Sequence, residues 1–128
     1  MRPNTRAVAL VALLSLGVGL HAFVVFFKAP GGLDSFGVGL LKLSIVPYLV
    51  AAALALISRN ALIGIVAVAL VLLVDAWTYY EVFFHPKGST AALALLWMPI
   101  WNPVLVVPIG AFVGWIWSGM LPADQNAP

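Results

Sequence analysis

Four apolar stretches, each long enough to cross a lipid bilayer as a helix, constrain the fold of this chain more than any other feature. They cover about residues 7–27, 36–57, 61–84 and 90–117. A helix of about 20 apolar residues crosses the hydrocarbon core of a membrane. Only 8% of the residues are charged, whereas soluble domains hold about 25%. The sequence therefore predicts an all-α integral membrane protein, a single transmembrane domain over residues 1–128 that folds as an antiparallel four-helix bundle.

The connections between these stretches are short. The second and third are separated by Ser-Arg-Asn, in which Asn60 is a good N-cap for the helix that follows. A connection of this length predicts that the two helices are direct antiparallel neighbours. We expect Pro47 to bend the second helix, and we expect the fourth to be kinked by three prolines, Pro99, Pro103 and Pro108.

The basic residues predict the orientation. Arg2, Arg6 and Arg59 would share one side of the membrane, and Lys28 and Lys87 the other. By the positive-inside rule, the side with more basic residues is cytoplasmic. We therefore expect a multi-pass protein of the cell (inner or plasma) membrane with both termini in the cytoplasm.

The basic start of the chain followed by an apolar run is also typical of a signal peptide, with a small-residue cleavage site at Ala22. Because the apolar run continues to Phe27, we expect a retained first helix instead.

Each predicted helix carries one polar side chain at a similar depth. Counting 1.5 Å per residue places these groups roughly 22–25 Å from the cytoplasmic end, in an outer-leaflet layer. The layer consists of His21, Lys42, Asp75 and Asn102. A lone charge at this depth costs about 2.5–3.5 kcal/mol, so charged residues here normally pair inside the bundle. We expect Lys42 to pair with Asp75; in the alternative, Lys42 extends to the outer headgroups and Asp75 lies at the water boundary.

Glu81 and His85 are weak candidates for a divalent-cation site at the outer end of the third helix. They are four residues apart and share a helix face. Two donors at this generic spacing are equally typical of a solvated helix end. No cofactor is predicted, because the chain has no cysteine and haem would need two histidines at one depth. The scattered basic residues form no patch for nucleic acid.

Small residues recur on one face of the fourth helix, at Gly110, Gly114 and Ser118. Such a face lets helices approach closely. It suits packing within the bundle and homo-oligomer formation equally well.

Two functions remain open from the sequence. One is a small protein of the lipid bilayer that binds or transports an ion or small polar solute at the polar layer. The other is a non-catalytic accessory subunit that binds a heteromeric membrane partner. An enzyme is less favoured, because no serine-nucleophile motif occurs.

Overall fold

Every regular element is a helix in the part of the chain that the computed structural model describes, residues 3–28, 34–86, 88 and 91–121. The helices are α1 (Pro3–Phe27), α2 (Ser35–Ile57), α3 (Ala61–Phe84), α4 (Ala91–Trp101), a π-helical segment η1 (Asn102–Val106) and α5 (Val107–Met120). Four helices are long and apolar enough to span a membrane, the last of them Leu93–Met120. The prediction of an all-α chain with four such helices is therefore confirmed.

The helix ends follow local chemistry. α1 begins at Pro3, earlier than expected, because proline fits the first turn of a helix. The side chain of Asp34 accepts a hydrogen bond of 2.6 Å from the backbone N–H of Gly37 and caps α2. Asn60 caps α3 through Leu62, which confirms the predicted N-cap.

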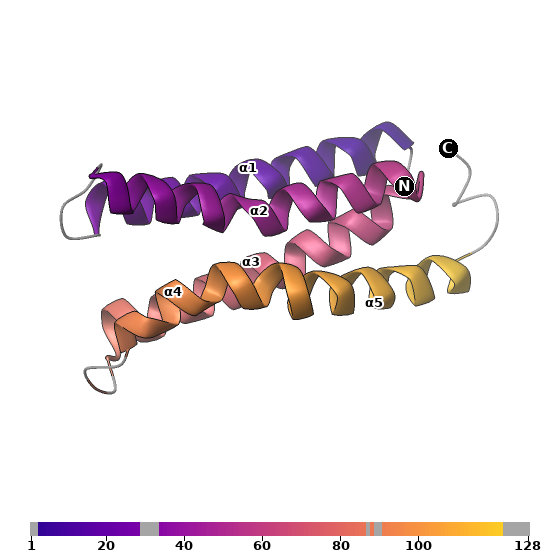
Figure 1. Cartoon of the computed structure of the whole chain (residues 1–128). Coiled ribbons are helices and arrows are strands. Elements are labelled where there is room, and N and C mark those ends of the chain that lie inside the picture. Colours follow the sequence, from indigo (N-terminus) through magenta and orange to yellow (C-terminus); the bar gives the residue numbers. More distant parts are fainter. Residues whose placement is uncertain (1–2, 29–33, 87, 89–90, 122–128) are drawn as a thin grey trace.

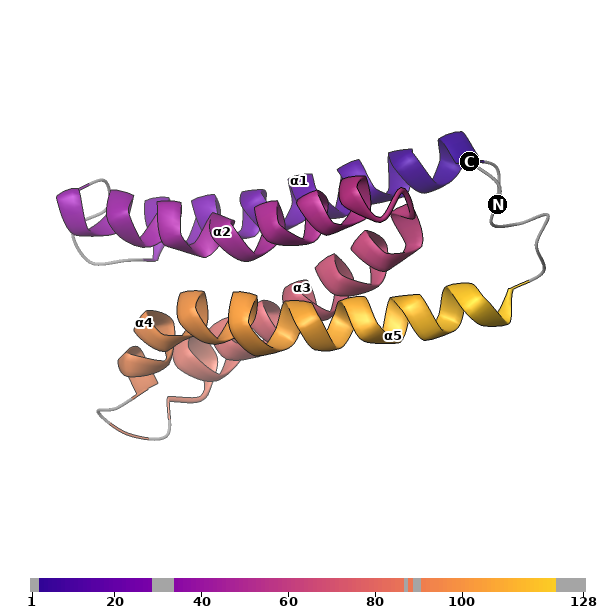
Figure 2. The same cartoon turned by 45° about the vertical axis from the view of Figure 1, so that its right-hand side comes forward.

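The helices lie side by side, with α2 and α3 at the centre of the arrangement. α3 contacts α1, α2, α4, η1 and α5. α2 likewise contacts every other helix, including α3. Figures 1 and 2 show α1 and α2 together, with α4 and α5 continuing one another across α3. Side chains that point inward from all four spans can therefore meet around α2 and α3.

Glycines on α5 bring it into close contact with α3. A Cβ atom added at Gly110 would lie 2.6 Å from the Cα of Ala67, and one added at Gly114 would lie 2.9 Å from the Cα of Ile63. Ser118, on the same face, is buried. The small-residue face of the fourth span thus lies against α3 within the same chain.

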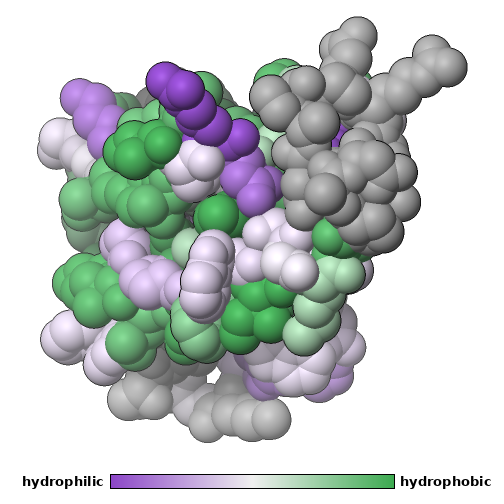
Figure 3. All heavy atoms as spheres, turned by 90° about the vertical axis from the view of Figure 1, so that its right-hand side faces the viewer, coloured by the Kyte–Doolittle hydropathy of each residue, from purple (hydrophilic) through white to green (hydrophobic). Residues whose placement is uncertain are grey.

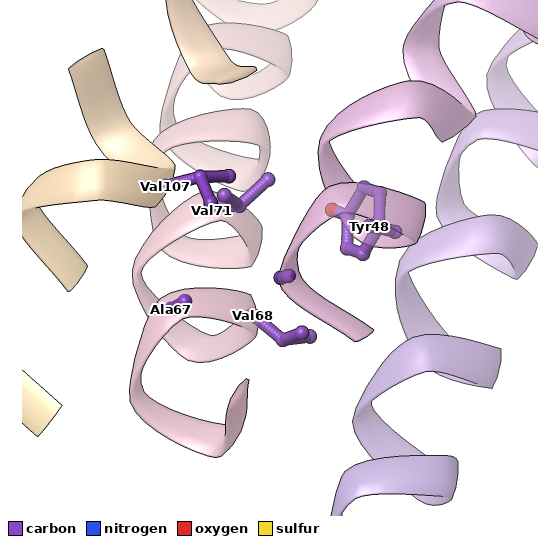
Figure 4. Packing of buried hydrophobic residues seen from close by; sticks show 6 residues of the cluster. Tyr48, Ala67, Val68, Val71 and Val107 are labelled. Atoms are coloured by element: carbon purple, nitrogen blue, oxygen red, sulfur yellow. The ribbon is translucent and has the colours of Figure 1, made fainter. Parts of the chain in front are cut away.

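A cluster of alanine and valine side chains around one tyrosine fills the centre of the bundle. It consists of Tyr48, Ala51, Ala67, Val68, Val71 and Val107. Figure 4 shows Tyr48 projecting from α2 toward α3, with Val107 beside Val71. This core directly underlies the polar site described below.

The outer surface is strongly apolar. No more than 28% of any candidate span is buried inside the structure, and large side chains such as Leu49, Phe112 and Trp115 are exposed. Figure 3, a view onto the end where α5 finishes, shows green hydrophobic atoms around its sides and purple hydrophilic atoms gathered mainly in its upper part. Soluble monomers rarely expose such large apolar areas. These features suggest a multi-pass membrane protein.

Candidate functional site: a buried carboxylate shared by four helices

Asp75, on α3, is completely buried, with 0% of its surface exposed. Its Oδ2 atom accepts hydrogen bonds from His21 Nε2 at 2.9 Å and from the Tyr48 hydroxyl at 2.5 Å. Its Oδ1 atom accepts a hydrogen bond of 2.5 Å from Asn102 Nδ2. Three donors from α1, α2 and η1 therefore surround one carboxyl group. This geometry suits the ionised form, which accepts hydrogen bonds and donates none.

His21 links Asp75 to a second tyrosine. Its Nδ1 atom is hydrogen-bonded to the hydroxyl of Tyr79, which lies one helical turn beyond Asp75 on α3. With a neutral ring, Nε2 donates to Asp75 and Nδ1 accepts from Tyr79; with a protonated ring, both nitrogens donate. The same contacts therefore accommodate a proton gained or lost at His21.

Gly17 makes room for this cluster. A Cβ atom at position 17 would lie 2.0 Å from the ring carbon Cε1 of Tyr48. Gly17 precedes His21 by one turn on the same face of α1. The ring of His21 in turn meets the rings of Tyr48 and Tyr79 edge-on, with centroids 5.5 Å apart in both pairs. Glycine at this position lets the tyrosine ring pass α1 and reach the carboxylate.

Asn102 supplies the contact from the fourth span. It is 2% exposed and begins η1, where its backbone carbonyl accepts from the N–H of Val107. Isolated π-helical turns within helices are frequent at functional sites. The side-chain Oδ1 of Asn102 has no hydrogen-bond partner among the described residues. One face of this amide thus has unused hydrogen-bonding capacity beside a carboxylate.

The structure brings together three of the four residues of the predicted polar layer. His21, Asp75 and Asn102 are in direct contact, whereas Lys42 is exposed. The predicted pairing of Lys42 with Asp75 is therefore wrong. The physical reason is angular: Lys42 lies two positions before the buried Ser44, about 200° around a helix of 3.6 residues per turn. A count of depth alone cannot detect that difference.

The sequence reasoning missed the two tyrosines. The spacing of Tyr79 from Asp75 was a usable signal, since residues four apart share a helix face. Tyr48 lies six residues beyond Lys42, the predicted layer residue of α2, or about 9 Å along the helix, and its long side chain reaches back to Asp75.

An apolar cavity of about 360 Å³ adjoins the cluster, with Tyr79 in its wall. Its other wall residues come from the C-terminal ends of α1 and α3, the N-terminal half of α2, and α4, together with Lys28 just after α1, and include Phe36, Leu40, Ser44, Phe83 and Leu95. We call it the outer cavity, after the side of the membrane on which the predicted orientation places it. Because Tyr79 contacts both the cavity and His21, a molecule in the cavity would lie one side chain away from the Asp75 cluster.

The candidate metal residues lie at the end of α3. The ring of His85 packs against Tyr80, with centroids 4.9 Å apart, and Glu81 is half-buried. Within the described ranges, no group of three or more His, Cys, Asp or Glu side chains is placed to hold a metal ion. Of the basic residues used to predict orientation, Arg2 and Lys87 lie outside the described residues.

No family model, curated protein or solved structure matches the chain. The class of protein is therefore defined by fold and site alone. It is a chain of four helices able to span a membrane, arranged around a buried carboxylate that bonds to all three other spans.

Proposed function

We propose that the protein binds or transports an ion or small polar solute at a polar layer in the outer leaflet of the cell membrane, and that a proton on the Asp75 cluster is part of this cycle. The main support for this proposal is that His21, Tyr48 and Asn102 all hydrogen-bond to the fully buried carboxylate of Asp75. Ionisable residues inside membrane spans are costly, and they commonly mark proton relays and solute pathways. In this proposal the four spans are antiparallel, the fourth is kinked at its prolines, and both termini are cytoplasmic.

The cluster itself has the parts of a two-state proton site. In the ionised state, the Asp75 carboxylate accepts from all three neighbours. Once protonated at Oδ1, it must donate one hydrogen bond, and rotation of the Asn102 amide by half a turn presents the unpartnered oxygen as an acceptor. A proton on Oδ2 can move to Nε2 when the neutral His21 ring carries its own proton on Nδ1. The Nδ1 proton then passes to the Tyr79 hydroxyl, which releases its own proton toward the outer cavity.

The test compares proton movement in liposomes that contain the purified protein. An imposed potassium diffusion potential drives protons inward, and an enclosed pH-sensitive dye reports their arrival. We expect Asp75→Asn, which keeps the shape of the side chain and removes its titration, to reduce the rate to that of protein-free liposomes. The protein should still elute as a single species.

Asp34→Asn is the matched control, because it makes the same chemical change where asparagine also serves as an N-cap. This variant should retain the wild-type rate. Equal rates for wild type, Asp75→Asn and protein-free liposomes would overturn the proton role and leave the cluster as a structural one.

The second candidate function is that of an accessory subunit in a larger membrane complex. It is favoured by Lys42, which is exposed on a membrane-spanning helix and has no carboxylate partner among the described residues. A partner helix carrying an acidic residue would neutralise this charge, as would snorkelling to lipid headgroups. Purification in a mild detergent separates the candidates, because a stoichiometric second protein that is lost in Lys42→Gln supports the subunit function.

A further inference from the structure

Ser44 lies on the wall of the outer cavity, and its hydroxyl has no hydrogen-bond partner among the described residues. The residue is 4% exposed. The hydroxyls of Thr78 and Ser58, by contrast, donate to backbone carbonyls of their own helices. The Ser44 oxygen is not among the fully buried atoms without a partner, so it retains surface open to the cavity. A polar ligand atom at this point would form the hydrogen bond that the protein does not supply.

Lys28 supplies a positive charge at the opposite end of the cavity. It directly follows the last residue of α1 and is exposed. The ion pair within the described residues is that of His21 with Asp75, so Lys28 has no carboxylate partner there. The nearest acidic residue along the chain among those described, Asp34, caps α2. The ammonium group is thus available to an anion.

Between these two polar groups the cavity is lined mainly by apolar side chains. On α2 its wall consists of Phe36, Gly37, Leu40 and Ser44, which follow one face of the helix. Ser44 lies eight residues beyond Phe36, which corresponds to about 12 Å along the axis. The cavity volume of about 360 Å³ is at the small end of the range of ligand pockets. A single apolar chain suits this shape better than a two-chain phospholipid does.

From this arrangement we propose that the outer cavity binds a medium-chain amphipathic carboxylate with a second polar group at its far end. The carboxylate pairs with Lys28, the apolar chain lies along α2 against Phe83 and Leu95, and the far polar group hydrogen-bonds to Ser44. This inference names the ligand of the proposed binding function and rests on that function. The ligand passes Tyr79, whose hydroxyl contacts His21, and so lies next to the proton site.

Photolabelling of the full-length protein in phosphatidylcholine nanodiscs tests the proposal. The probe is 10-hydroxydecanoate carrying a diazirine at mid-chain, with mass spectrometry to locate the labelled residues and unlabelled acids as competitors. We expect the label on cavity residues such as Leu40, Phe83 and Leu95. We also expect 10-hydroxydecanoate to compete better than decanoate, and decylamine not to compete.

Three variants with matched controls assign the contacts. Lys28→Gln should weaken competition by 10-hydroxydecanoate about fivefold or more, whereas Lys42→Gln should not. Ser44→Ala should weaken competition by 10-hydroxydecanoate about threefold to tenfold and leave competition by decanoate unaffected. Thr78→Ala should change competition by neither acid. Leu40→Trp, which fills the cavity, should abolish the specific label.

The proposal would be overturned if the labels were spread over the exposed faces of the helices and were unchanged in Lys28→Gln and Leu40→Trp. That pattern would show that the probe partitions into the lipid and does not bind in the cavity. A phospholipid found in the cavity by native mass spectrometry would overturn the proposal as well. Loss of cavity labelling with intact Asp75-dependent proton flux would refute this inference alone. Specific labelling without that flux would refute only the proton role in the proposed function.

Discussion

Asp75 is held by donors that lie on separate helices, so each partner of the carboxylate influences both charge and packing. His21, at 1% exposure, is as inaccessible to water as Asp75 itself. A buried charge that loses its partner is left desolvated, and such losses typically cost about 3–5 kcal/mol. The residues of the cluster should therefore behave as one energetic unit, and Lys42 should not belong to it.

A double-mutant cycle measures the coupling energy between Asp75 and His21 directly. Asp75→Leu leaves donors of His21, Tyr48 and Asn102 unpaired, and His21→Leu leaves the carboxylate with two donors instead of three. Each single variant should lower the melting temperature clearly. The loss in free energy of unfolding of the double variant should be smaller than the sum of the two single losses, by about 0.5–3 kcal/mol.

The cycle of Lys42→Met with Asp75→Leu serves as the control. Its effects should add to within about 0.5 kcal/mol, because the two side chains do not meet. Coupling between Lys42 and Asp75 as large as that between His21 and Asp75 would contradict the structure of the cluster.

At the scale of elements, the contact between α3 and α5 positions Asn102 against Asp75. This contact depends on the absence of side chains at Gly110 and Gly114, where the nearest opposing atoms belong to the backbone of α3. Backbone atoms cannot move aside as a flexible side chain can. Any side chain on this face therefore pushes the fourth span away from the carboxylate.

Gly110→Ala tests this dependence. A Cβ atom 2.6 Å from the Cα of Ala67 should lower the melting temperature and weaken the contact of Asn102 with Asp75. Gly119→Ala in the same helix is the control, because nothing lies within 4 Å of its added Cβ and alanine favours helix by roughly 0.5–1 kcal/mol. Equal stability of the two variants would show that α5 does not pack on α3 in this way.

The sequence was sufficient to predict the helical elements but not the details of their faces. Uninterrupted apolar length predicted four spans, and Asn60 predicted the start of α3. Depth counting found His21, Asp75 and Asn102 because all three lie on inward faces. It failed for Lys42 because depth carries no information about rotation around the helix. The π-helical turn at Asn102–Val106 lies among the prolines for which a kink was predicted, but the sequence did not predict its π-helical form.

At the scale of the whole molecule, the Asp75 cluster lies within a set of four strongly apolar helices and adjoins a cavity of about 360 Å³. The polar site contains exchangeable protons, and the outer cavity offers a positive group at one end and an unsatisfied hydroxyl at the other. Tyr79 is common to both. The function proposed for the molecule therefore depends on whether Asp75 changes its protonation state in the folded protein.

Infrared difference spectroscopy answers that question most directly. Spectra of the protein in nanodiscs are compared between about pH 4 and about pH 9, a range that spans the ordinary values for carboxyl and imidazole groups. The proposed proton role predicts a protonated-carboxyl C=O band that appears as the pH falls, is absent in Asp75→Asn and persists in Asp34→Asn. A spectrum in which no carboxyl band distinguishes wild type from Asp75→Asn at any pH would contradict it, since Asp75 would then hold one protonation state throughout.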